Sequence, residues 1–146
     1  MGLYWAYHIP YRLMAELFGG DFMAEKKVLL VEDYDASRGF MSFLLATEGL
    51  KVLEARNGVE AVELATSELP DLILMDLFMP LMDGFEATAT IRGQESTKDI
   101  PIIVISAHLD TGDWRLQARA VGADECLDKP VDLDMLRTVI KQYTSP

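Results

Sequence analysis

From residue 26 onward, short apolar runs alternate with longer segments of helical period. Parallel strands buried on both faces are continuous apolar runs, and helices usually connect them. The pattern predicts strands at residues 27–31, 51–55, 71–75, 102–105 and 125–127. It predicts helices between and after them, at about 35–47, 58–69, 84–92, 111–121 and 132–143. Asp35 is expected to cap the first helix, and Gly49 to end it.

The handedness of the connections limits the topologies open to such a chain. Right-handed crossovers favour a doubly wound, five-stranded parallel sheet. Among such α/β folds, we expect the flavodoxin-like (βα)5 type with strand order 2-1-3-4-5. In these sheets the ligand site lies outside the carboxyl ends of the strands. Polar residues follow four of the predicted strands: Glu32, Asp33, Asp76, Ser106 and Lys129. We therefore expect one site that contains all five.

Three of these residues are carboxylates, and their repulsion calls for a cation. Two unit charges 4 Å apart interact by about 4 kcal/mol at an effective dielectric of 20. Oxygen ligands favour a hard ion such as Mg²⁺, and the lack of nearby His or Cys argues against zinc. With a metal and Lys129 stabilising an incoming phosphoryl group, a carboxylate can attack phosphorus and become an acyl phosphate. Asp76, between the other groups, is the candidate nucleophile, and Ser106 is the candidate hydroxyl donor.

The site residues belong to four short motifs. These are the pair Glu32-Asp33, the segment DLFMPLMDG at residues 76–84, Ser106-Ala107 and Lys129-Pro130. Together they resemble the receiver domain of two-component response regulators over about residues 26–143. The resemblance implies that Asp33 and Asp76 bind Mg²⁺ directly, that Glu32 binds it mainly through water, and that the carbonyl of Phe78 is a further ligand. It also implies a cis Lys129-Pro130 peptide bond.

The resemblance implies a phosphohistidine donor, either a histidine kinase or a histidine phosphotransfer protein. The receiver would catalyse its own phosphorylation and dephosphorylation without being an enzyme in the usual sense. The phosphoryl group adds a charge of about −1.5 to −2, which would shift the population toward a conformation in which Ser106 and Lys129 reach it. A downstream protein target would read this change on a surface that includes Trp114, Arg115, Cys126, Arg137 and Lys141.

Two residues depart from the usual pattern of that family. Cys126 stands three residues before Lys129, where the family usually has Tyr, Phe or His, whose ring turns inward on activation. Without that ring, switching would depend on another side chain or on loop movement. Phe78 lies near the expected path of the attacking water and would slow hydrolysis of the phosphoryl group.

Charge and cysteine content restrict the partners and the compartment. The formal net charge of −11 argues against direct binding to nucleic acid, whose phosphates require clustered Lys and Arg. A basic protein surface is a better match. Cys126 is the only cysteine, so no intramolecular disulfide can form, and a reducing cytoplasm is the simplest compartment.

Residues 1–24 form an extension that precedes the receiver-like part, residues 25–146. Its apolar and aromatic residues are interrupted well short of the roughly 20 that a transmembrane helix needs. One interpretation is a short helix at residues 11–18 that packs on the domain or on a second copy of the chain, forming a homodimer. Others are a non-native or upstream-translated extension with Met23 as the native start, peripheral membrane contact, and disorder.

Three other functions share parts of this pattern. A receiver-like scaffold that binds a partner without phosphorylation is the main alternative, and Cys126 is the feature that favours it. An aspartyl phosphatase would need a second Asp two positions after the nucleophile, where Phe78 stands. A flavin carrier would need a phosphate cradle after strand one, where acidic residues would repel phosphate. If the sequence is a complete protein, we expect a stand-alone receiver whose output is a protein contact. If it is a fragment, the output domain lies outside it.

Overall fold

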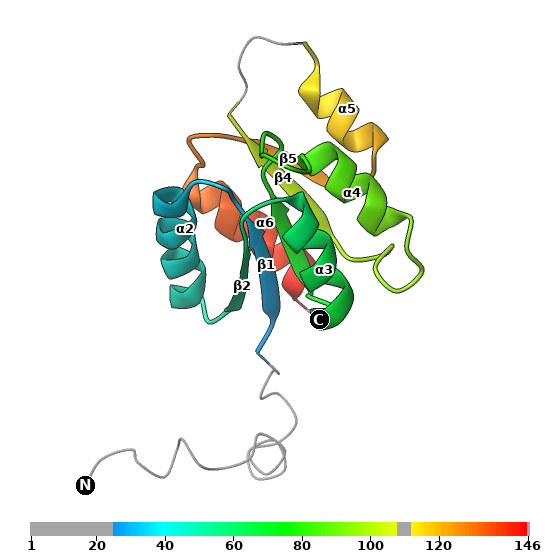
Figure 1. The fold of residues 1–146 in the computed structure, drawn as a ribbon. Helices are drawn as coiled ribbons and strands as arrows, with labels where there is room; N and C mark the ends of the chain where they lie inside the picture. The colour runs from blue at the N-terminus through cyan, green and yellow to red at the C-terminus, as the bar shows by residue number, and fades with distance from the viewer. Residues whose placement is uncertain (1–24, 108–111, 146) are drawn as a thin grey trace, which may run out of the picture.

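The computed structural model describes residues 25–107 and 112–145. Within them, five strands alternate with five helices (Figure 1). The strands are β1 (Lys27–Val31), β2 (Lys51–Ala55), β3 (Leu72–Met75), β4 (Ile102–Ser106) and β5 (Glu125–Asp128). The helices are α2 (Asp35–Thr47), α3 (Gly58–Glu68), α4 (Gly84–Arg92), α5 (Trp114–Ala120) and α6 (Leu133–Thr144). All strand pairs are parallel, in the order β2-β1-β3-β4-β5, which confirms the predicted fold.

Helices cover both faces of the sheet, α2 and α6 on one side and α3, α4 and α5 on the other (Figure 1). Side chains alternate between the two faces along each strand. In β1, Val28 and Leu30 therefore pack toward Leu45 of α2 and Ile140 of α6. Leu29 and Val31 belong to the other core layer. This two-sided burial explains why the strands read as unbroken apolar runs.

The predicted cap of the first helix is wrong. Tyr34 occupies the N-cap position of α2 and its side chain makes no capping hydrogen bond, while Asp35 is the first helical residue. The carboxylate of Asp35 pairs with Arg38 one turn later, so it is not available to the backbone N–H groups of the first turn. By contrast, the side chains of Asn57, Asp83, Asp113 and Asp132 cap their helices as such residues usually do.

Helix α5 is shorter than predicted. Asp113 accepts a hydrogen bond from the backbone N–H of Leu116, and the helix begins at Trp114. Gly112 has a φ of 77°, in the left-handed region, so it lies outside the helix. The remaining boundaries agree with the prediction to within one or two residues.

Part of the surface predicted to contact a target is buried or faces elsewhere. Trp114 and Cys126 belong to the core layer beneath α3, α4 and α5. Arg137 pairs with Glu48 at the end of α2, with 2.6 Å between Nε and Oε1, so it faces α2. Trp114 and Cys126 are buried because both are apolar: Trp114 is the first residue of α5, and Cys126 is an inner residue of β5. Arg115 and Lys141 remain exposed.

No helix in the described residues is long and apolar enough to cross a bilayer. The predicted helix at residues 11–18, and the extension to which it belongs, lie outside the described residues.

Candidate active site

Three carboxylates gather at the carboxyl edge of the sheet. Glu32, Asp33 and Asp76 each offer an oxygen, and these oxygens lie within 4.8 Å of one another. Glu32 and Asp76 are buried, whereas Asp33 is exposed. The predicted convergence of the strand ends is therefore observed. Such a group of oxygen donors matches the ligand preference of a divalent hard cation.

The sheet itself sets the positions of Glu32 and Asp76. Each lies one residue past its strand, yet each still donates its backbone N–H to a neighbouring strand. Glu32 donates to the carbonyl of Ala55 at 3.0 Å, and Asp76 to the carbonyl of Val31 at 3.1 Å. The two side chains therefore start from backbone that is as rigid as the sheet.

Helix α4 approaches the backbone of Asp76 closely. A Cβ atom at Gly84 would lie 2.1 Å from the Asp76 carbonyl oxygen, so only glycine fits there. The N–H of Gly84 donates to the carbonyl of Leu77 at 2.8 Å, and the N–H of Leu77 donates to Asp76 Oδ1 at 2.8 Å. This packing holds the backbone and the carboxylate of Asp76 in place.

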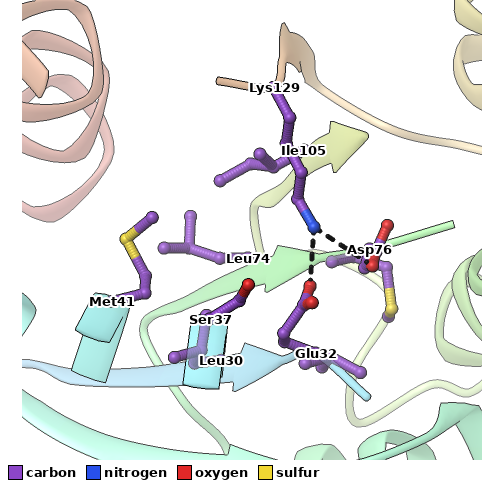
Figure 2. A pocket seen from close by; sticks show the side chains of 10 residues that line it. Leu30, Glu32, Ser37, Met41, Leu74, Asp76, Ile105 and Lys129 are labelled. Carbon is purple, nitrogen blue, oxygen red and sulfur yellow. Dashed lines mark hydrogen bonds and ion pairs between the residues drawn. The ribbon is translucent and has the colours of Figure 1, made fainter. Parts of the chain in front are cut away.

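Lys129 supplies the positive charge of the cluster (Figure 2). Its Nζ lies 2.8 Å from Glu32 Oε2 and 3.3 Å from Asp76 Oδ2. Its backbone N–H donates to the carbonyl of Ser106 at 3.0 Å, which ties the loop after β5 to the end of β4. The Lys129-Pro130 bond is cis, as predicted. Four of the five predicted polar residues thus lie together through their side chains.

The charges of the cluster shift the pKa values of its members. The pKa of Asp76 is raised to about 6, first by burial and then by a hydrogen bond with Glu32, while the charge of Lys129 opposes the increase. Burial lowers the pKa of Lys129, but the bond to Glu32 and the charge of Asp76 outweigh burial and raise it overall. The cluster holds three carboxyl groups and one ammonium group. A divalent cation would balance the excess negative charge, so the residues fit Mg²⁺.

A cavity of about 40 Å³ opens beside the cluster, between α2 and the sheet (Figure 2). Glu32, Asp76 and Lys129 form its polar end, and Ser37, Met41 and apolar strand residues form the rest. A water molecule needs at least about 10–15 Å³, so solvent has room to reach the buried side of the carboxylates. Sequence reasoning missed Ser37 and Met41, because neither belongs to a recognisable motif.

The other two predicted site residues lie around this cluster. Ser106 is fully buried, and its hydroxyl has no hydrogen-bond partner within the described residues. Phe78 is 52% exposed, and its ring packs edge-on against Phe85 with centroids 6.4 Å apart. Metal binding by the Phe78 carbonyl and phosphoryl binding by Ser106 stay predictions.

Sequence reasoning also missed Arg38, which lies under the loop that carries Glu32 and Asp33. Its Nη1 donates to the carbonyl of Glu32 at 3.0 Å. A signal was present in the sequence, because Arg38 is the only basic residue of α2. Its partners cannot be read from the sequence, since one of them, Glu54, lies on another strand.

Comparison with known proteins identifies the family. A model of the response regulator receiver domain matches residues 28–141. The chain belongs to this receiver family. This chain is 32% identical over 118 residues to the polar-differentiation response regulator DivK of Brucella anthropi. The match covers 81% of this chain and 95% of DivK. The chain is 42% identical over 122 residues to hybrid signal transduction histidine kinase G of Dictyostelium discoideum, covering 82% of this chain but 4% of the kinase.

A solved receiver domain of similar fold holds a magnesium ion. The receiver domain of sensor histidine kinase PA1611 from Pseudomonas aeruginosa PAO1, with a magnesium ion coordinated in its active site cleft, superposes with a TM-score of 0.76. It is 32% identical, and the match covers 82% of this chain and 98% of that one. Receiver domains act in two-component signalling, and apart from their own phosphotransfer chemistry they are usually not enzymes.

Proposed function

We propose that this receiver accepts a phosphoryl group on Asp76 from a phosphohistidine, with Mg²⁺ bound by Glu32, Asp33, Asp76 and the carbonyl of Phe78. The donor is a histidine kinase or a histidine phosphotransfer protein. The observation that carries the proposal is the position of Asp76, which lies within the carboxylate cluster and 3.3 Å from the ammonium group of Lys129. A nucleophile, a cation site and a fixed positive charge therefore adjoin one another.

In this reaction an oxygen of ionised Asp76 attacks phosphorus. The bond from phosphorus to the donor nitrogen breaks, and its electron pair stays on the imidazole, which takes up a proton. Bound Mg²⁺ would supply positive charge to the phosphoryl oxygens. Lys129 would supply a second positive charge by turning from Glu32 and Asp76 toward the same oxygens. Hydrolysis returns Asp76, with water as the attacking group, and Phe78 would slow that attack.

The output is a population shift centred on Ser106. Its buried hydroxyl lacks a hydrogen-bond partner in the described residues, and a phosphoryl oxygen on Asp76 would provide one. Movement of Ser106 would carry the end of β4 and the backbone of Lys129 with it, because these are hydrogen-bonded. A downstream protein target would read the altered surface around α5, β5 and α6. Because Cys126 is buried and has no ring, transmission would depend on another side chain or on loop movement.

We also propose where this receiver acts and which partners it has. The receiver spans residues 25–146 and acts in the cytoplasm, where its kinase and its target are proteins and nucleic acid is not a direct partner. The segment at residues 1–24 would be an addition to the receiver, and contact between two copies of the chain would be one use for it.

The test is intact mass after incubation with Mg²⁺ and a small acyl-phosphate donor. The parent should gain one phosphoryl group, whereas Asp76→Asn should gain none and EDTA should prevent the gain. Asp99→Asn is the matched control, because Asp99 is an exposed acid away from the cluster. If the parent gains nothing under conditions that modify a known receiver, the chain is a scaffold that works without phosphorylation.

A further inference from the structure

Arg38 is a buried charge whose partners surround the loop between β1 and α2. The residue is only 8% exposed. Its Nη1 donates to the Glu32 carbonyl at 3.0 Å, its Nη2 lies 2.5 Å from Asp35 Oδ1, and its Nε lies 3.3 Å from Glu54 Oε1. Burying a charge is costly unless it is paired in this way. One guanidinium group thus connects the end of β1, the start of α2 and the edge strand β2.

The loop that Arg38 holds contains Asp33. The backbone of Glu32 is bound on both sides, since its N–H donates to Ala55 and its carbonyl accepts from Arg38. At the other end of the loop, the same guanidinium holds the Asp35 carboxylate. Asp33 lies between these two anchors, and no described residue donates a hydrogen bond to its carboxylate. Its distance from Asp76 therefore depends on the backbone that Arg38 fixes.

We propose that Arg38 is a positioning residue for the metal site, one that places the Asp33 carboxylate at the distance from Asp76 that a divalent cation requires. This inference rests on the proposed function, because it assumes that the carboxylate cluster binds Mg²⁺. Groups that orient metal ligands change metal affinity by about 10–100-fold when they are lost. Arg38 acts from beneath the loop and touches neither the cation nor the phosphoryl group.

The planar fork of arginine is what the position requires. Its three nitrogens point in different directions. They reach the carbonyl of Glu32, the carboxylate of Asp35 at the start of α2 and the carboxylate of Glu54 on β2. Lysine carries the same charge on a single nitrogen and cannot hold the three partners at once. Arg38→Lys thus keeps the buried charge while it releases the loop, and it separates positioning from charge balance.

The experiment is isothermal titration of the full chain with Mg²⁺, comparing the parent with Arg38→Lys and Arg38→Met. Both variants should bind Mg²⁺ about 10–100-fold more weakly than the parent. Amide hydrogen exchange at residues 33–36 in EDTA should be faster in both, which is a readout that needs no metal. Arg38→Lys keeps the inference testable if Arg38→Met fails to fold.

Arg92→Lys is the matched control, because Arg92 also joins several segments through its guanidinium but at the opposite edge of the sheet. It should bind Mg²⁺ as the parent does. Equal affinity in the parent and in Arg38→Lys would overturn the inference alone. So would an equal loss of affinity in Arg92→Lys, because general loosening would then explain both. A parent that does not bind Mg²⁺ would overturn the proposed function and this inference with it.

Discussion

The amino and carboxyl ends of the parallel strands form two opposite edges of the sheet. These two edges use the same kinds of charged residue in opposite ways. At the amino edge, Asp71 accepts a hydrogen bond from the N–H of Lys27 at 2.8 Å, and Asp124 accepts one from the N–H of Ile102 at 2.8 Å. Each of these acids holds the start of a strand. At the carboxyl edge, three acids offer oxygens within 4.8 Å of one another, and two of them, Glu32 and Asp76, pair with Lys129. The acids that bind backbone N–H groups, Asp71 and Asp124, lie apart from each other, whereas the acids expected to bind a cation lie together.

Arginine shows the same contrast. Arg92 donates to the carbonyls of Gly122 at 2.9 Å, Ile100 at 2.6 Å and Lys98 at 3.0 Å, and it pairs with Asp124 at 2.7 Å. These bonds join loops that lead into β4 and β5, where no ligand is expected. Arg38 makes similar bonds beneath the metal site. Polar groups without partners occur mainly at functional sites. We therefore expect changes at the amino edge to lower stability and changes at the carboxyl edge to affect magnesium binding and phosphorylation.

The largest loss of stability is expected at the amino edge. Arg92→Ala removes four hydrogen bonds and leaves carbonyls without a donor, which should lower the free energy of unfolding by about 3 to 4 kcal/mol. The measurement is urea unfolding. Magnesium affinity and phosphorylation of the folded protein should match the parent, because the change lies at the far end of the strands. A loss of magnesium binding in the folded variant would remove the distinction between the two edges.

The next effect belongs to Lys129, the counter-charge of the cluster. Lys129→Met leaves Glu32 and Asp76 without their ion pair, and should lower the free energy of unfolding in EDTA by about 2 to 3 kcal/mol, less than for a fully buried pair because Lys129 is partly exposed. Saturating Mg²⁺ should recover more stability in this variant than in the parent. Unchanged stability in EDTA would mean that the carboxylates do not depend on Lys129.

Asp76→Asn should make the protein more stable while it abolishes phosphorylation. Burial raises the pKa of Asp76 to about 6, so folding favours the protonated form. That contribution is complete below about pH 4 and is lost as the pH rises through about 6. In EDTA, the variant should therefore exceed the parent by on the order of 2 kcal/mol more at pH 8 than at pH 4, allowing for partial contact with solvent.

The measurement is urea unfolding of both proteins at several pH values, with Asp99→Asn as the exposed control. If the difference in free energy of unfolding stays constant from pH 4 to pH 8, ionised Asp76 does not destabilise the folded protein. The carboxyl edge would then be as relaxed as the amino edge.

The sequence predicted the fold and the location of the site because both depend on local patterns. Apolar runs mark the strands, and the polar residue after each strand marks the carboxyl edge. The errors arose where a distant or competing partner decides the outcome. Asp35 pairs with Arg38 and so does not cap its helix. Arg137 turns toward Glu48, which is 89 residues away in the sequence. Arg38 was overlooked for the same reason, since its contact with Glu54 exists only in the fold.

The smallest effects on stability are expected for two buried hydroxyl groups. Ser106 and Thr88 are both fully buried, and neither hydroxyl has a partner within the described residues. Ser106 lies at the carboxyl edge, whereas Thr88 lies in the middle of α4. Ser106→Ala and Thr88→Val should each change the free energy of unfolding by less than about 1 kcal/mol, because neither breaks a hydrogen bond.

Function should separate the two variants where stability does not. Phosphorylation should slow amide exchange at residues 104–107 in the parent and in Thr88→Val, because the Ser106 hydroxyl binds the phosphoryl group and draws the end of β4 toward it. Ser106→Ala should accept the phosphoryl group but lose this response. If Ser106→Ala still shows the full response, the signal leaves the site by another route, and the unpaired hydroxyl of Ser106 has no more functional meaning than that of Thr88.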